Sequence, residues 1–218
     1  MITFTTWDIV RNLMLAWRWT ILLSLVTFLL GGALGLVILF MRTSRQNWLR
    51  QVARLYIELF QGTPLLMQLF LVFFGIALFG VEVPAWLAAG LALMCWSASY
   101  LAEIWRGCVE AIPKGQWEAS SVLAMGYFQQ MRYIVLPQAF RIAIAPTVGF
   151  GVQIIKSTAV TSIIGFIELS KAGTVITNAT FRPFTVFAIV GAFYFVLCWP
   201  LSKYSQSLER KYNAAHRH

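Results

Sequence analysis

The stretch WTILLSLVTFLLGGALGLVILF, residues 19–40, runs for 22 residues without one charged side chain. A helix rises about 1.5 Å per residue, so this stretch is long enough to cross the hydrocarbon core of a bilayer, which is about 30 Å thick. Four further apolar stretches follow, at about residues 55–79, 83–104, 143–166 and 184–201. The sequence therefore predicts an all-α, polytopic membrane protein with five transmembrane helices.

The composition supports a membrane protein. Hydrophobic residues make up 59% of the 218 residues, charged residues only 11%, and the mean hydropathy is +0.72. A soluble domain has about a quarter of its residues charged, so this chain has too little polar surface to cover a water-soluble globule. No linker or low-complexity tract divides the chain. We expect a single transmembrane domain over residues 1–218.

The distribution of basic residues predicts the topology. A net charge of +9 could indicate nucleic-acid binding, but twelve of the 17 Lys and Arg fall on one side of the predicted bundle. Loops rich in Lys and Arg stay in the cytoplasm, so we expect the amino terminus outside, the carboxyl terminus inside and no nucleic-acid partner. The twelve follow the first span, the third span and the fifth span: Arg42, Arg45, Arg50, Arg54, Arg106, Lys114, Arg132, Arg141, Lys203, Arg210, Lys211 and Arg217.

One long cytoplasmic loop is expected at about residues 105–141. It is too polar to span a membrane, yet residues 118–125 are good helix formers. Pro113 and Gly115 predict a break before this helix, and Pro137 should start or kink the helix that follows. A short helix with an apolar face favours docking with a soluble partner protein, and the alternative is an amphipathic helix lying on the membrane surface.

Two segments of this loop carry a family resemblance. The sequences AIPKGQWEA at 111–119 and RYIVLPQA at 132–139 resemble the EAA loop of importer-type ABC permeases, in the branch that carries polar amino acids. Glu118 and Pro137 are separated by 19 residues, as the family motif requires. Three more stretches resemble this branch in the same order along the chain: ELFQGTPLL at 58–66, AEIWRG at 102–107, and KST with SIIG at 156–165.

The resemblance implies a type I (MetI-like) importer fold in the bacterial inner membrane and a permease that moves polar amino acids. It implies as partners two ATP-binding subunits, a second permease subunit (copy or paralogue), an external solute-binding protein and membrane lipid. ATP and Mg²⁺ belong to the ATP-binding subunits, and this chain is expected to hold no cofactor or metal and to be no enzyme. The sequence agrees, because Ile155 stands where a phosphate-binding loop needs the glycine before Lys156.

The resemblance also assigns residues to coupling with the ATP-binding subunit. Small side chains at Ala119 and Ser120 allow close approach, and Glu118 can cap a helix or pair with a basic residue of the partner. The family has a glycine six residues after the glutamate. Here Ala124 stands at that place and Gly126 two residues later, so either could adopt a left-handed turn. The coupling residues are Pro113, Gly115, Glu118, Ala119, Ser120, Ala124, Gly126, Leu136 and Pro137.

A second group of candidates consists of polar residues inside the predicted spans, where a buried polar group costs about 3 kcal/mol. Gln153, Ser157 and Thr161 share one helical stripe. Lys156 and the hydroxyls could bind a carboxylate or line a wet path, or Lys156 could pair internally, for instance with Glu58. A helix break at residues 62–64 would free backbone groups near a cavity. The path candidates are Glu58, Gly62, Thr63, Pro64, Gln153, Lys156, Ser157, Thr158, Thr161 and Ser162.

Two other functional classes fit the sequence less well. An ATP-independent secondary transporter or channel for small polar solutes would need no cytoplasmic docking helix. A membrane enzyme would need clustered acids, histidines or cysteines near an interface. The three cysteines, Cys95, Cys108 and Cys198, are isolated, so the sequence does not favour an enzyme.

Overall fold

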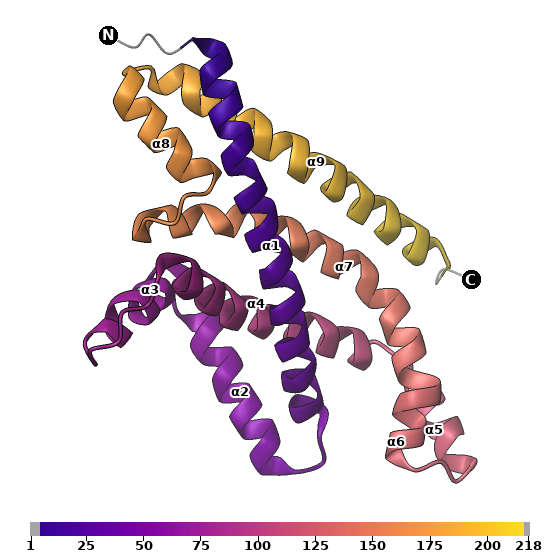
Figure 1. Ribbon diagram of the computed structural model, residues 1–218. Helices are drawn as coiled ribbons and strands as arrows, with labels where there is room; N and C mark the ends of the chain where they lie inside the picture. Colours follow the sequence, from indigo (N-terminus) through magenta and orange to yellow (C-terminus); the bar gives the residue numbers. More distant parts are fainter. Residues whose placement is uncertain (1–4, 216–218) are drawn as a thin grey trace.

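Nine α-helices make up most of the computed structural model, which describes residues 5–215 and the side chains of residues 5–211 (Figure 1). Arg217 lies outside the described residues. Every regular element within them is helical, as the sequence predicts. They are α1 (Thr6–Thr43), α2 (Asn47–Gly62), α3 (Leu65–Phe70), η1 (Leu71–Gly75), α4 (Ala85–Glu110), α5 (Lys114–Val122), α6 (Tyr127–Gln130), η2 (Met131–Val135), α7 (Leu136–Ser157), η3 (Thr158–Ile164), α8 (Leu169–Thr180) and α9 (Pro183–Ala215).

The chain crosses the membrane five times, once as a bent helix pair. Four helical stretches in the described part are long and apolar enough to span alone, and α2 with α3–η1 qualifies as a pair bent by 103°. The Tyr127 hydroxyl donates to the Thr43 carbonyl at 2.7 Å, so the end of α1 lies beside the loop that follows α4. Because α4 extends about 39 Å from that loop, the bent pair must cross to reach its start.

Close packing of α1 on α4 forms the centre of the bundle. A Cβ atom on Gly31 would lie 2.0 Å from the Ser97 Oγ, and one on Gly35 would lie 3.2 Å from the Ala98 carbonyl oxygen. Only glycine allows two helices to approach this closely, as in the small-xxx-small packing of membrane helices. The long helix α1 is therefore held tightly against α4 in the centre of the bundle.

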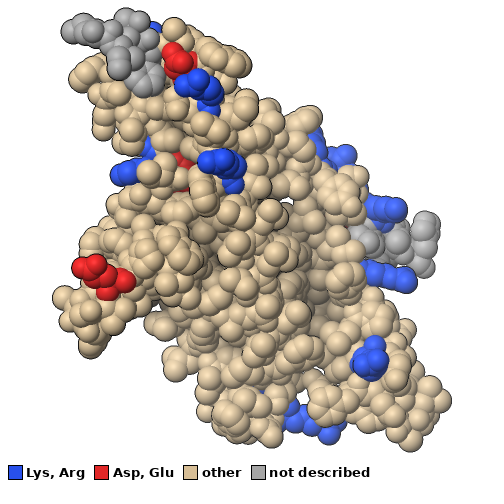
Figure 2. Space-filling model, in the orientation of Figure 1, with Lys and Arg blue, Asp and Glu red and all other residues tan. Residues whose placement is uncertain are grey.

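The bundle has two chemically distinct ends. The loop end holds the α1–α2 turn, α5, α6 and the end of α9, and the amino-terminal end holds the start of α1, α8 and the start of α9 (Figure 1). The second end has its own apolar core, which includes Leu13, Leu169 and Val186. In Figure 2 the centre of the face shown carries no charged side chain, as expected for a lipid-facing belt.

Two helical features were not predicted. The helix that contains the fourth predicted span begins well before residue 143, because α6, η2 and α7 continue one another from Tyr127. Helix α8 was not predicted, because its 12 residues are too short to span and its apolar positions pack on the neighbouring α1 and α9.

Candidate functional site

The helix α5 is the part of the EAA loop that projects from the bundle. Pro113 is its N-cap residue, and the Pro113 carbonyl accepts the Gln116 N–H at 2.9 Å. Gly115 lies inside the first turn, so the prediction that it breaks the chain before the helix is wrong. The proline alone ends the preceding turn, because its ring fixes φ and removes a donor.

The left-handed turn after α5 falls at Ala124, where φ is +56°. The Met125 N–H donates to the Ser120 carbonyl at 3.2 Å, and the Ala124 N–H donates to the Ser121 carbonyl at 3.0 Å. These two bonds form a Schellman motif, which ends a helix on one left-handed residue. Gly126 has φ −69° and is the N-cap residue of α6, so it does not supply the turn.

A small core fixes α5 and α6 to the membrane helices. Ser120 is buried, and the Gln130 side-chain amide donates to the Ser121 Oγ at 2.9 Å. Trp117 and Tyr127 pack against buried apolar residues that come from the end of α4 and from η2 and α7. The loop is therefore packed against both α4 and α7. The buried members of this core are Cys108, Val109, Ile112, Met131, Val135, Ala139 and Ala143.

The outward surface of the loop is apolar and unpaired. Val122, Leu123 and Phe128 are 87%, 74% and 86% exposed. Glu118 and Ala119 are also exposed, and no described residue forms a hydrogen bond or salt bridge with the Glu118 carboxylate. Exposed apolar side chains around a free carboxylate are typical of a protein-binding surface.

Pro137 lies in the first turn of α7, where the sequence predicts that it starts or kinks the helix. It has no N–H to donate, and the chain passes through the wider π-helical turn of η2 just before it. The Leu136 N–H then bonds to the Met131 carbonyl, and the Gln138 side chain donates to the Ile134 carbonyl at 2.8 Å. Leu136 and Pro137 thus join the loop to α7 without a flexible link.

The break in the second span is where the sequence predicts it. Gly62 ends α2, and Thr63 and Pro64 separate it from α3. The Gln68 side-chain amide donates to the carbonyls of Phe60 and Thr63, at 2.8 and 3.0 Å, and to the Thr63 Oγ1 at 2.9 Å. Gln68, which the sequence analysis did not single out, satisfies backbone groups that the bend releases.

The polar cluster of the fourth span divides between two faces. Helix α7 ends at Ser157 and continues as the tighter 3₁₀ turns of η3, which changes the spacing. Gln153 is exposed whereas Ser157 and Thr161 are buried, so the members of the predicted stripe differ in their access to the surface of the single chain. Thr158 is also buried, and its hydroxyl donates to the Ile155 carbonyl at 2.8 Å. The half-buried residue of the group is Ser162.

Lys156 and Glu58 do not pair. Lys156 is exposed, and the Glu58 carboxylate instead forms a salt bridge with the Arg54 Nε at 2.7 Å, one turn earlier on α2. Lys156 is thus left on an outer surface of the single chain, together with Gln153.

Comparison with known proteins identifies the family. The model of the binding-protein-dependent transport system inner membrane component matches residues 31–212. The chain belongs to this family. The permease is 36% identical over 194 residues to a probable amino-acid ABC transporter permease protein, YckA, of Bacillus subtilis (strain 168), covering 89% of this chain and 86% of the relative. It is 30% identical over 207 residues to the arginine ABC transporter permease protein ArtM of Haemophilus influenzae, covering 91% of each chain.

Solved structures confirm the fold of the permease. A crystal structure of an amino acid ABC transporter with histidines matches with a TM-score of 0.89 and 33% identity, covering 96% of this chain and 100% of the other. The inward-facing MetNI methionine ABC transporter matches with a TM-score of 0.69 and 19% identity, covering 94% and 96%. The expected MetI-like permease fold is confirmed.

The permease contains one buried carboxylate that the sequence analysis missed. Glu168 is 0% exposed and caps α8, where its Oε1 accepts the Lys171 N–H at 2.8 Å. Its Oε2 accepts the Tyr194 hydroxyl of α9 at 2.9 Å and the Thr20 hydroxyl of α1 at 3.4 Å. The Thr20 Oγ1 also accepts the Leu169 N–H at 3.1 Å. Burial raises the pKa of the Glu168 carboxyl, and the donated hydrogen bonds oppose this rise.

A local signal for this role exists in the sequence. Glu168 directly precedes an apolar position, and an acidic residue at the start of a helix satisfies free N–H groups and complements the helix dipole. The three-helix junction itself could not be anticipated, because Thr20 and Glu168 are 148 residues apart.

Proposed function

We propose that the permease is the membrane subunit of an ABC importer for polar amino acids, with its amino terminus outside and the EAA loop in the cytoplasm. The observation that carries this proposal is the surface of α5 and α6, which is apolar, exposed and rigidly attached to two spans. The names of the relatives as amino-acid permeases support the substrate class.

In this proposal, α5 docks into a cleft of a separate ATP-binding subunit. Ala119 allows close approach, and Glu118 pairs with a basic group of that subunit. The partner binds and hydrolyses ATP with Mg²⁺, and its closure moves α5 together with α4 and α7, which share one core with the loop. Packed elements of this kind switch between discrete arrangements, so the motion alternates the bundle between inward-facing and outward-facing states.

The transport path in this proposal forms between two permease subunits, copies or paralogues. Lys156 and Gln153 lie on an outer surface of the single chain, where a second subunit could enclose them. The other residues proposed to line the path are those of the bend at 62–64 and the hydroxyls of Ser157, Thr158 and Thr161. An external solute-binding protein delivers the amino acid. Substitution of Lys156 by Met is expected to reduce transport, and unchanged transport with unchanged substrate-stimulated ATPase would exclude Lys156 from the path.

The test of coupling is the Glu118→Lys variant in the complete importer, reconstituted in proteoliposomes with its ATP-binding subunits and binding protein. A reversed charge on the docking surface should abolish uptake and its stimulation of the ATPase, while the permease remains folded in the membrane. The matched control is Glu209→Lys, because Glu209 is another exposed carboxylate, on α9 at the same end. Unchanged uptake by Glu118→Lys would refute the docking role, and uptake by the permease alone would favour an ATP-independent transporter.

A further inference from the structure

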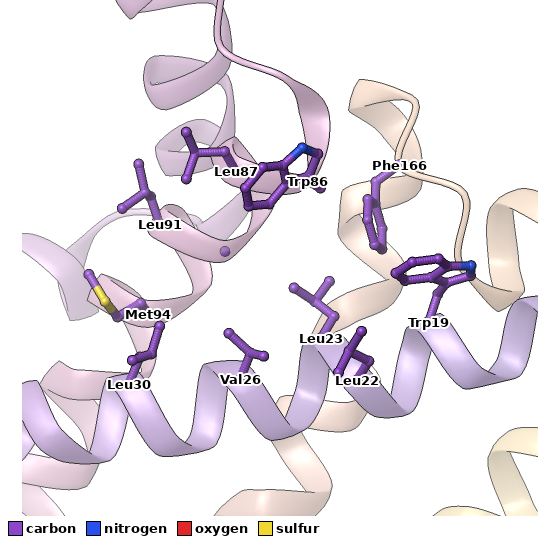
Figure 3. Close-up of a pocket in the computed structure, with 11 residues that line it drawn as sticks. Trp19, Leu22, Leu23, Val26, Leu30, Trp86, Leu87, Leu91, Met94 and Phe166 are labelled. Carbon is purple, nitrogen blue, oxygen red and sulfur yellow. The ribbon is translucent and has the colours of Figure 1, made fainter.

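A surface groove between α1 and α4 has no role in the proposed transport cycle. It has a volume of about 480 Å³, and every residue that lines it is apolar or aromatic. Figure 3 shows Leu30 and Met94 close together at one end of the groove and Trp19 beside Phe166 at the other. The groove is open at the surface of the single chain.

The length of the groove matches one leaflet of a bilayer. Trp19 and Leu30 are eleven residues apart on α1, which is about 17 Å along the axis, and half of the hydrocarbon core is about 15 Å. Trp19 lines the groove at the end where the first predicted span begins, and Trp86 lies nearer the middle of the groove (Figure 3). Tryptophan is enriched at the level of the lipid headgroups, so the Trp19 indole is placed as an interface marker would be.

A cation lies beside the headgroup end of the groove. The Arg18 guanidinium carbon is 5.8 Å from the centre of the Trp19 ring. Arg18 is exposed and forms no salt bridge with a described residue. A guanidinium binds phosphate oxygens through two parallel hydrogen bonds, which makes it a suitable partner for a phospholipid headgroup.

We propose that this groove binds an anionic phospholipid, with one acyl chain between α1 and α4 and the phosphate at Arg18. The apolar wall selects hydrocarbon, the length selects a chain that spans one leaflet, and the cation selects a negatively charged headgroup. The site is separate from the EAA loop and from the polar segments, so it does not depend on which solute the permease carries.

The groove can be filled by one substitution. Gly90 lines it, and a Cβ atom added there would meet no atom within 4 Å. Gly90→Leu therefore places a side chain in the space of the acyl chain without a clash in the protein. Gly191 on α9 is the matched control, because it is a helical glycine with the same free space around an added Cβ.

The experiment uses the complete importer in nanodiscs that contain phosphatidylglycerol with a photoreactive diazirine in its acyl chain. Labelled residues are mapped by mass spectrometry. We expect labelling at residues 19–30 and 86–94 above that on the lipid-facing side of α9. Gly90→Leu should lower it to the α9 level, and Gly191→Leu should not.

The headgroup is tested with Arg18→Gln and the neutral phosphatidylcholine analogue. The loss of a charge-assisted hydrogen bond should reduce the preference for phosphatidylglycerol by about tenfold, whereas the surface substitution leaves the packing of the bundle intact. A retained preference would overturn the proposal, even if Gly90→Leu assembles poorly. Equal labelling of all lipid-facing helices would show that the groove holds only the ordinary lipid that surrounds the protein, and it would overturn the proposal. A disulfide between two copies that carry Leu22→Cys would show that a second permease fills the groove.

Discussion

The two ends of the bundle satisfy their polar groups in different ways. In the EAA loop most side-chain hydrogen bonds are local, such as the one between Gln130 and Ser121, nine positions apart, and one long-range bond joins the Tyr127 hydroxyl to the Thr43 carbonyl. At the amino-terminal end, Glu168 joins three helices and reaches Thr20, 148 residues away. The shape of the loop therefore depends mainly on residues close together in the chain, whereas the amino-terminal junction can form only when α1, α8 and α9 are assembled.

The two ends also differ in whether their carboxylates are exposed or buried. The loop end presents a carboxylate, Glu118, that has no described partner, and it leaves large apolar side chains such as Phe128 in the open. The carboxylate of the other end, Glu168, is completely buried and accepts bonds from several donors. The comparison separates an exposed carboxylate, which we propose pairs with a partner subunit, from a buried one that stabilises the fold.

The substitution with the largest expected effect breaks the amino-terminal junction. Glu168→Ala should destabilise the permease by about 3 kcal/mol, because it removes the buried acceptor of the Tyr194 and Thr20 hydroxyls and the cap of α8. The measurement is the free energy of unfolding of the purified permease in mixed micelles.

The same exchange at the other end is the control. Glu118→Ala should change the unfolding free energy by less than about 0.5 kcal/mol, since an exposed side chain without partners contributes little. Equal destabilisation by Glu168→Ala and Glu118→Ala would contradict the distinction between the two ends.

The next largest loss of stability is expected from a substitution in the contact between α1 and α4. Gly31→Ala should destabilise the permease by about 2 kcal/mol, because its Cβ would lie 2.0 Å from the Ser97 Oγ and would force α1 away from α4. Gly32→Ala is the neighbouring control, since its Cβ would be 3.7 Å from Trp105, an ordinary contact. The thermal unfolding midpoints of both variants check this, and a Gly31→Ala midpoint equal to that of Gly32→Ala would refute it.

The spans and the family were predictable because their signals are local. An uncharged run of 22 residues predicts a membrane helix by itself, and the glutamate-to-proline spacing of the EAA loop lies within one segment. The bend at residues 62–64 was also predicted, because glycine and proline act on their own backbone.

The features that the sequence did not predict depend on the neighbours of a residue in space. Helix α8 is too short to be recognised alone, and it folds against the distant α1 and α9. Gln153 and Ser157 are one turn apart in α7 yet differ in burial, because the exposure of each position depends on the helices packed around it rather than on helical spacing. The pairing of Lys156 with Glu58 failed because Arg54 lies one turn from Glu58 on the same helix.

The smallest predicted effect is a gain in the stability of the turn that ends α5, at the loop end. Ala124 has φ +56°, a conformation that costs an L residue about 1 kcal/mol and costs glycine nothing. Ala124→Gly should therefore slow hydrogen exchange of the amides that close the turn, notably that of Met125, which bonds to the Ser120 carbonyl. The expected gain is about 0.5 kcal/mol, because glycine also gives the unfolded chain more freedom.

The comparison within this turn is Gly126→Ala. Gly126 has an ordinary extended backbone, and an added Cβ would come no closer than 4.0 Å to the Gln129 side chain, so exchange in the α5 turn should stay unchanged. If Gly126→Ala weakened the turn and Ala124→Gly did not strengthen it, the left-handed residue would be Gly126. The EAA loop would then end α5 two residues later, and Leu123 would sit inside the helix instead of at its exposed end.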